Sequence, residues 1–200
     1  MFYETSSNDH GLPHNPFKAI VSPRPIGWIS SLDAEGRTNL APYSFFNAVG
    51  DRPPIVMFSS SGYKDSAANV EATGEFVCNM ASWDLKDEMN VSSAAVPSET
   101  SEFELSGLDM AASRLVRTPR VARAVTALEC KHLQTIKLTD LEGAETDNWI
   151  VFGQVVGIHI DDSIIVNGKV DVTRYKPLSR LGYMEYAAIT EVFEMSRPTI

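Results

Sequence analysis

The architecture of this chain depends on one run of residues, Asn39-Leu40-Ala41-Pro42-Tyr43-Ser44-Phe45-Phe46-Asn47. The run begins as a β-strand, and Pro42 removes a backbone N–H that a neighbouring strand would need. A proline in such a place is typical of a sheet edge or a bulge, where backbone groups are free for a ligand. Small polar side chains alternate here with aromatic ones. The run therefore predicts a sheet edge that faces a binding site.

A second run, Ser59-Ser60-Ser61-Gly62-Tyr63-Lys64-Asp65-Ser66, connects an apolar strand to a helix expected over 64–73. Such a junction directs backbone N–H groups at a helix N-terminus, which attracts anions, and Lys64 adds a charge that suits a phosphate. Asp65 is expected to cap the helix rather than to touch the phosphate. An ordinary loop before a capped helix is the alternative. Together the two runs suit a flat, polar-edged ring with a phosphate on a flexible tail, which is the shape of flavin mononucleotide (FMN).

Four consecutive residues of the first run are candidates for contact with such a ring: Ser44, Phe45, Phe46 and Asn47. On a strand the two phenylalanines point to opposite faces, so at most one of them packs in the core on a given side. The Asn47 amide offers donors and an acceptor for the polar edge of the ring. Core packing beside a turn is the alternative interpretation.

Two further residues are candidates from their surroundings. Arg24 lies between two prolines that stiffen the backbone, so its guanidinium is expected to reach a phosphate or a partner subunit, with a surface ion pair as the alternative. His159 ends a strand before two aspartates, and it is a candidate to gate a substrate or hold a nicotinamide ring. A structural hydrogen bond is the alternative for His159. No group of residues has metal-ligand spacing, and Cys78 and Cys130 read as buried free thiols.

The pattern of elements predicts a single mainly β domain. Strands are expected over 26–32, from Thr38 onward with an interruption at Pro42, and over 55–59, 75–80, 124–138 and 150–160. Helices are expected over 64–73 and 83–91. Many short strands with few helices predict a closed β-barrel with helices on its rim. The long connection over 92–113 is a candidate functional loop. We expect an N-terminal arm over 1–16, a domain over 17–190 and a C-terminal tail over 191–200.

Composition narrows the class of partner. The chain has 200 residues and a net charge of −9, which argues against nucleic acid or an anionic membrane as the main partner. A small phosphorylated ligand needs only one local cationic pocket. No apolar run reaches the roughly 20 residues of a membrane span, and the polar N-terminus lacks a secretory signal, so we expect a cytoplasmic protein.

Several motifs, in one order and spacing, resemble those of the flavin reductase-like family of FMN-binding split-barrel proteins, which includes flavoredoxins. The resemblance runs from about Phe17 to Tyr186. The motifs are Ser22–Ser30, Asn39–Asn47, Lys64-Asp65-Ser66 with Asn69, Thr73–Val77 and Arg180-Leu181-Gly182.

The resemblance implies a six-stranded split β-barrel (Greek key) with a few peripheral helices, which forms a homodimer with FMN between the subunits. It implies that Ser44, Phe45, Phe46 and Asn47 line the flavin ring, and that Ser59, Ser60, Lys64, Asp65 and Ser66 form the segment that holds the phosphate. Tyr43 is a further candidate for contact with the cofactor. The family commonly has threonine in place of Ser66, and both side chains offer a hydroxyl. Where relatives often have a second glycine, this chain has Tyr183, which is expected to narrow the substrate pocket.

Such a protein is expected to transfer a hydride from NADH or NADPH to flavin and to pass electrons to an acceptor or a partner oxygenase. Hydride transfer needs two juxtaposed rings and no catalytic acid or base, so the lack of a catalytic triad does not argue against it. Two alternatives stay open: an FMN-binding electron carrier without nicotinamide activity, and a non-enzymatic split-barrel binding module.

Overall fold

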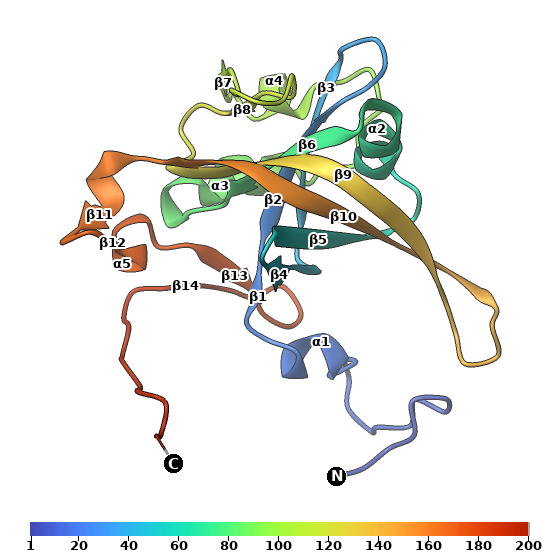
Figure 1. The fold of residues 1–200 in the computed structure, drawn as a ribbon. Helices are drawn as coiled ribbons and strands as arrows, with labels where there is room; N and C mark the ends of the chain where they lie inside the picture. Colours follow the sequence, from blue (N-terminus) through green and yellow to red (C-terminus); the bar gives the residue numbers. More distant parts are fainter. Residues whose placement is uncertain (200) are drawn as a thin grey trace.

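The computed structural model describes residues 1–199, so that Ile200, the last residue of the predicted tail, lies outside the described part. The main sheet has seven strands in the order β3-β2-β6-β9-β10-β5-β4, each antiparallel to its neighbours (Figure 1). Its strands are β2 (Gly27–Leu32), β3 (Thr38–Tyr43), β4 (Phe46–Asp51), β5 (Pro54–Ser61), β6 (Glu75–Met80), β9 (Thr126–Thr139) and β10 (Glu145–Ile160).

Smaller elements surround the main sheet. A three-stranded sheet has the order β1-β13-β14, and two strand pairs are β7-β8 and β11-β12. These strands are β1 (Arg24–Pro25), β7 (Met110–Ala111), β8 (Arg120–Val121), β11 (Ile165–Val166), β12 (Lys169–Val170), β13 (Leu178–Arg180) and β14 (Tyr186–Ala188). The helices are α1 (Phe17–Ile20), α2 (Asp65–Thr73), α3 (Lys86–Val91), α4 (Glu102–Leu105) and α5 (Val172–Tyr175), with the 3₁₀ turns η1 (Trp83–Leu85) and η2 (Asp162–Ile164).

The prediction of a mainly β split barrel with few helices is confirmed. The main sheet has seven strands where the sequence predicted six, because the run that starts at Asn39 is not one strand. It leaves β3 after Tyr43, bends at Ser44 and Phe45, and enters β4 at Phe46. β3 and β4 are the two edge strands of the sheet, so this bend joins its two edges.

Two glycines let aromatic rings pack directly on the sheet. A Cβ on Gly27 would lie 2.4 Å from the ring of Phe46, and a Cβ on Gly153 would lie 2.4 Å from the ring of Phe76. Both rings belong to the main hydrophobic core. Phe46 is therefore a core residue. Ser44 and Phe45, which form the bend before it, are partly exposed.

Two buried carboxylates hold the segment 113–118 against the sheet. Glu129 on β9 accepts hydrogen bonds from the backbone N–H groups of Arg114–Val116 at 2.6–3.1 Å. Glu75 on β6 accepts from those of Arg117 and Thr118 at 2.6 and 3.1 Å. Five backbone donors of a segment without helix or strand therefore have carboxylate partners.

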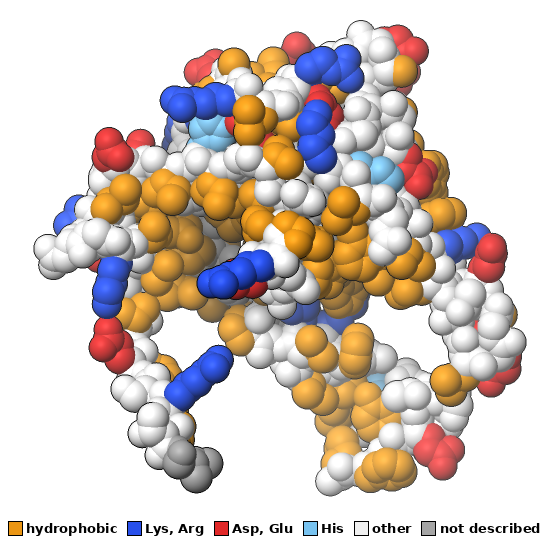
Figure 2. Space-filling view, viewed as in Figure 1, with side chains coloured by type: hydrophobic (Ala, Val, Ile, Leu, Met, Phe, Trp, Pro, Cys, Tyr) orange, Lys and Arg blue, Asp and Glu red, His pale blue; other side chains and the backbone are white. Residues whose placement is uncertain are grey.

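The strands β9 and β10 extend beyond the rest of the sheet as a long hairpin, and both chain ends lie away from the barrel (Figure 1). Apolar side chains form a band across the face in Figure 2, over the middle of the molecule. The large apolar side chains that are exposed on β9 and β10 are Leu133, Ile136, Leu138, Ile158 and Ile160. Among residues 1–199, no helix has the length and apolar character needed to span a membrane.

Candidate functional site

Two adjoining cavities lie where β3, α2 and the segment after α3 meet. We call the larger one, of about 450 Å³, the α2 cavity; it is lined by Asn39, Ala41, Pro42, Tyr43, Lys64, Asp65, Ser66, Ser92–Val96, Ser98 and Glu102. We call the smaller one, of about 230 Å³, the Arg180 cavity; it is lined by Lys18, Arg24, Ile26, Pro42, Ser44, Met89, Ser93, Arg180, Leu181, Tyr183 and Tyr186. The two share Pro42 and Ser93, so they lie next to each other.

The junction between β5 and α2 supplies free donors to the α2 cavity. Gly62 has a φ of +87°, a conformation that glycine adopts without strain and that turns the chain from the strand into the helix. No acceptor within residues 1–199 binds the backbone N–H groups of Asp65 and Ser66, which begin α2. None of the ion pairs in that part of the chain uses Lys64. This end of the cavity is therefore suited to an anion.

A cluster of buried hydroxyls lies beside these donors. The Asn39 side-chain amide donates to the Ser66 hydroxyl at 2.9 Å, and the Ser60 hydroxyl donates to the Gly62 carbonyl at 2.8 Å. Burial raises the pKa of Tyr43, although the nearby Ser66 and Ser60 hydroxyls act to lower it. The Tyr43 phenol therefore stays protonated at neutral pH and keeps a hydrogen to donate.

Two carboxyl groups also line the α2 cavity, and each has a partner. Asp65 accepts a hydrogen bond from the Ser98 hydroxyl at 3.1 Å, and the buried Glu102 accepts from the Leu40 N–H at 3.0 Å. Burial raises the pKa of Glu102, the Leu40 N–H lowers it, and the charge of Asp65 raises it further. The prediction that Asp65 caps α2 is wrong: Lys64 occupies the N-cap position without a side-chain cap, and Asp65 is the first helical residue.

Arg24 lines the Arg180 cavity, but its guanidinium is used mainly inside the protein. It donates to the carbonyls of Lys18 and Val21, and to the Leu181 carbonyl at 2.7 Å. Only its Nε is buried without a partner. The sequence expectation of a guanidinium free to reach a phosphate does not match this arrangement. Arg24 instead connects the chain after α1 to the chain after β13.

The other side of the Arg180 cavity is formed by the turn between β13 and β14. Arg180 donates to the Tyr183 carbonyl at 2.5 Å, and its guanidinium lies 4.3 Å from the centre of the Tyr186 ring. These contacts fix a positive charge at the cavity wall. Tyr183 has a φ of +55°, which is the left-handed region that favours glycine.

The structure thus brings seven predicted site residues to the two cavities, namely Tyr43, Lys64, Asp65, Ser66, Arg24, Ser44 and Tyr183. Other predicted residues lie next to them without lining them. Phe45 packs under the Arg24 guanidinium and accepts the Ser59 N–H at its carbonyl, and the Asn47 side chain accepts the N–H of Ala48.

His159 is not brought to this site. Its Nε2 lies 2.5 Å from an Oε atom of Glu129, the carboxylate that holds the segment 113–118, and it lines neither cavity. The structural alternative given for His159 above accounts for this position.

Several lining residues had no local signal in the sequence. Ser92–Val96, Ser98 and Glu102 belong to the long connection after α3, whose length alone marked it as a candidate functional loop. Arg180 lies in a motif that the family resemblance rests on, which could have identified it.

Comparison with known proteins agrees with this geometry. Residues 21–175 match the model of the flavin reductase like domain. An uncharacterised protein of Aquifex aeolicus is 37% identical over 173 residues, which are 84% of this chain and 85% of that protein.

Three solved structures share the fold. Nitrilotriacetate monooxygenase component B from Bacillus cereus has a TM-score of 0.88 at 29% identity, with 98% of each chain covered. A 2-nitrobenzoate 2-nitroreductase from Pseudomonas fluorescens has a TM-score of 0.86 at 28% identity, covering 100% of this chain and 97% of that one. A putative flavin reductase with a split barrel domain from Shewanella frigidimarina has a TM-score of 0.83 at 18% identity, covering 99% and 100%. With most of its length matched by the domain model, this chain belongs to the flavin reductase-like family.

Proposed function

We propose that this chain binds FMN and transfers a hydride from NADH or NADPH to it, so that reduced FMN passes electrons to an acceptor or a partner oxygenase. The observation that carries the proposal is the set of free anion donors in one of two adjacent cavities. Lys64 and the N–H groups of Asp65 and Ser66 have no partner within residues 1–199.

The residues present fit FMN. A phosphate needs several donors and a positive charge, which Lys64, the start of α2 and the Ser66 hydroxyl offer. The carboxyl groups of Asp65 and Glu102 accept hydrogen bonds from other parts of the chain. The Arg180 cavity adjoins the α2 cavity at Pro42 and Ser93, so it could take a ring whose phosphate lies at the start of α2. Cavities of about 300–1,000 Å³ are usual for ligands of this size.

Flavin supplies the hydride chemistry when it is bound, and the protein supplies binding, orientation and electrostatics. Lys64 and Ser66 would hold the phosphate, and Ser44 would face the ring edge. The Arg180 guanidinium, which is fixed on Tyr186, would stabilise negative charge that develops on a ring in its cavity. Tyr183 and the segment after α3 would limit the access of water.

Related proteins support the proposed chemistry. The two solved structures of highest similarity reported above are a monooxygenase component and a nitroreductase, and both are redox proteins by name. A monooxygenase component that is similar over the full length of this chain supports an oxygenase as the receiving partner.

We also propose a homodimer. Apolar side chains on the neighbouring strands β9 and β10 are exposed: Ile136 is 41% exposed, and Ile158 and Ile160 are 60% and 42% exposed. An exposed apolar sheet face of this kind is typical of a protein–protein interface. Analytical ultracentrifugation tests the assembly, and a monomer at micromolar concentration would contradict it.

Three other statements stay predictions from the sequence. They are a cytoplasmic location, domain boundaries at residues 16 and 190, and the exclusion of nucleic acid and membrane as partners.

An anaerobic absorption titration tests the proposed function directly. FMN-loaded protein is mixed with NADH and, separately, with NADPH, and the flavin bands are followed. We expect rapid loss of the bands with at least one of the two, which identifies the donor. Flavin that binds but keeps its colour with both would indicate the electron carrier. A chain that binds no FMN at micromolar concentration would contradict the proposal and leave a binding module.

A further inference from the structure

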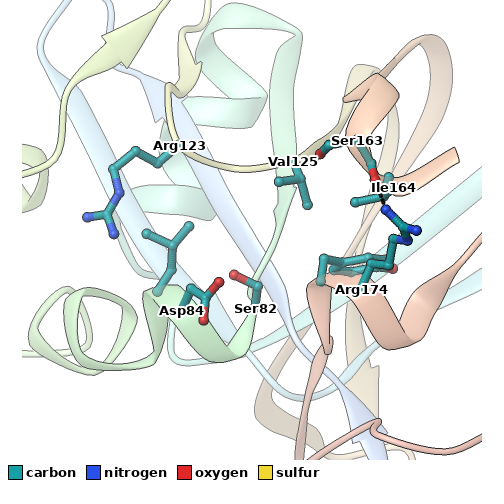
Figure 3. Close-up of a pocket in the computed structure, with 9 residues that line it drawn as sticks. Ser82, Asp84, Arg123, Val125, Ser163, Ile164 and Arg174 are labelled. Atoms are coloured by element: carbon teal, nitrogen blue, oxygen red, sulfur yellow. Dashed lines mark hydrogen bonds between the residues drawn. The ribbon is translucent and has the colours of Figure 1, made fainter.

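A third cavity, of about 530 Å³, lies away from the two that form the candidate flavin site. Its walls come from η1, from the chain between β8 and β9, from η2 and from α5 (Figure 3). It shares no lining residue with the α2 cavity or the Arg180 cavity. We propose that this cavity is a second ligand site, which binds a small organic acid with one carboxylate on an apolar body.

Two neutral donors at the cavity lack partners. The Ser82 side chain is 6% exposed, and no hydrogen bond joins its hydroxyl to any residue in the range 1–199. In Figure 3 its hydroxyl points into the space between the labelled residues. Tyr175 is partly buried, and burial raises the pKa of its phenol, so the phenol is protonated at neutral pH. The Ser82 hydroxyl is open to the cavity, so that it can donate to a ligand oxygen there.

Two guanidinium groups on the rim have donors left. Arg123 pairs with Glu88 through Nη1, at 2.5 Å. Arg174 donates through Nη1 to the Ser163 carbonyl at 3.1 Å, and its Nε lies 3.8 Å from a carboxylate oxygen of Asp171. The remaining nitrogen of each fork, Nη2, makes no hydrogen bond within the part of the chain that the structure describes. Free guanidinium donors are the groups that bind a carboxylate.

The rest of the lining sets the class of ligand. Part of the lining is apolar, because it includes Val125 and the buried side chains of Leu85 and Ile164. Asp84 also lines the cavity, and its charge opposes that of the arginines. One carboxylate therefore suits the site better than a doubly charged phosphate or a polyanion, and an apolar body suits the apolar part of the lining.

Benzoate is a suitable probe, because it combines one carboxylate with a compact apolar ring. Its binding is measured by isothermal titration calorimetry on the full chain, with and without saturating FMN. We expect one saturable site whose Kd does not change when FMN is added. Neutral benzamide, which has the same shape, is expected to bind at least about 10-fold more weakly.

Two variants that change the charge of the cavity lining in opposite directions make the test decisive. Arg174→Gln is expected to raise the benzoate Kd about 10-fold, and Asp84→Asn to lower it severalfold, while Arg197→Gln in the exposed tail leaves it unchanged. FMN affinity, measured on the same preparations, should not change. No benzoate binding, displacement of benzoate by FMN, or a Kd that both variants leave unchanged would overturn the proposal. Asp84→Asn decides the matter if Arg174→Gln does not fold. Because FMN binding is measured separately, failure here does not bear on the proposed flavin site.

Discussion

The side-chain amide of Asn39 on β3 donates to the Ser66 hydroxyl in the first turn of α2 at 2.9 Å. This bond fixes the start of the helix against the strand that forms the opposite wall of the α2 cavity. A second side-chain amide, that of Asn69 on α2, donates to the Ser31 hydroxyl on β2 at 3.2 Å. The free N–H groups of α2 are therefore held in place before any ligand arrives, which reduces the entropy lost on binding.

Replacement of Ser66 tests this arrangement. Ser66→Ala removes a hydroxyl from the proposed phosphate site and leaves the Asn39 amide without its acceptor. We expect the FMN Kd to rise about 5- to 10-fold and the unfolding free energy to fall by about 1–3 kcal/mol. Ser66→Thr keeps the hydroxyl and should retain most of both. Fluorescence quenching of FMN and urea unfolding measure the two effects, and equal values for the alanine and threonine variants would contradict this role.

Replacement of Lys64 separates the phosphate from the ring. Lys64→Met keeps most of the length of the side chain and removes its charge. We therefore expect the binding free energy of FMN to weaken by about 1.5–3 kcal/mol, so that its Kd rises. Riboflavin, which lacks the phosphate, should bind the variant and the unchanged protein equally. Lys169→Met, at an exposed lysine on β12, is the matched control. A Lys64→Met variant that loses riboflavin to the same extent would show that Lys64 does not act through the phosphate.

The sequence located the proposed anion-binding end of the candidate site but not most of its other lining residues, for a physical reason. Lys64, Ser66 and the turn at Gly62 are neighbours in the chain, so a local pattern contains them. The wall formed by Ser92–Ser98 comes from a segment without helix or strand, and only tertiary packing brings it to α2.

Arg24 and His159 also show the limit of predicting site residues from local sequence patterns. Local surroundings marked both as free functional groups. His159 has a partner that is distant in sequence, the Glu129 carboxylate, and so does Arg24, whose guanidinium donates to the Leu181 carbonyl as well as to the nearby carbonyls of Lys18 and Val21. The mainly β fold was predictable because alternation along each strand is itself a local signal.

Glu129 should make the fold sensitive to acid. Burial raises its pKa, but hydrogen bonds from the Arg114 N–H, from His159 and from the Leu115 N–H lower it by more, so the pKa in the folded protein lies below the ordinary value of 4.5. The resulting stabilisation is complete above that ordinary value and is lost as the pH falls from it through the lower, folded pKa.

Glu129→Gln tests this dependence. We expect the unfolding free energy at pH 7 to fall by at least about 2 kcal/mol, because charge-assisted hydrogen bonds to the segment 113–118 weaken. The decline in unfolding free energy between pH 4.5 and pH 3 should become shallower than in the unchanged protein. Urea unfolding at several pH values measures both. Glu35→Gln, at an exposed glutamate, is the control, and an unchanged acid dependence in Glu129→Gln would contradict the assignment.

Tyr183 combines an unfavourable backbone conformation with a position at the mouth of the Arg180 cavity. Its φ of +55° costs a residue with a Cβ about 1 kcal/mol relative to glycine. Tyr183 is 48% exposed, so little packing is lost when its side chain is removed. Its main aromatic contact is with His14, at a ring distance of 5.6 Å.

We therefore expect Tyr183→Gly to keep or raise the unfolding free energy. Tyr183→Ala should lower it, because alanine keeps the unfavourable φ and loses the contact with His14. If the tyrosine narrows the pocket for the nicotinamide, both variants should reduce bound flavin faster in anaerobic stopped-flow experiments with NADH or NADPH. A glycine variant that is less stable than the alanine variant would contradict the strain argument, and unchanged reduction rates in both would show that Tyr183 does not limit access.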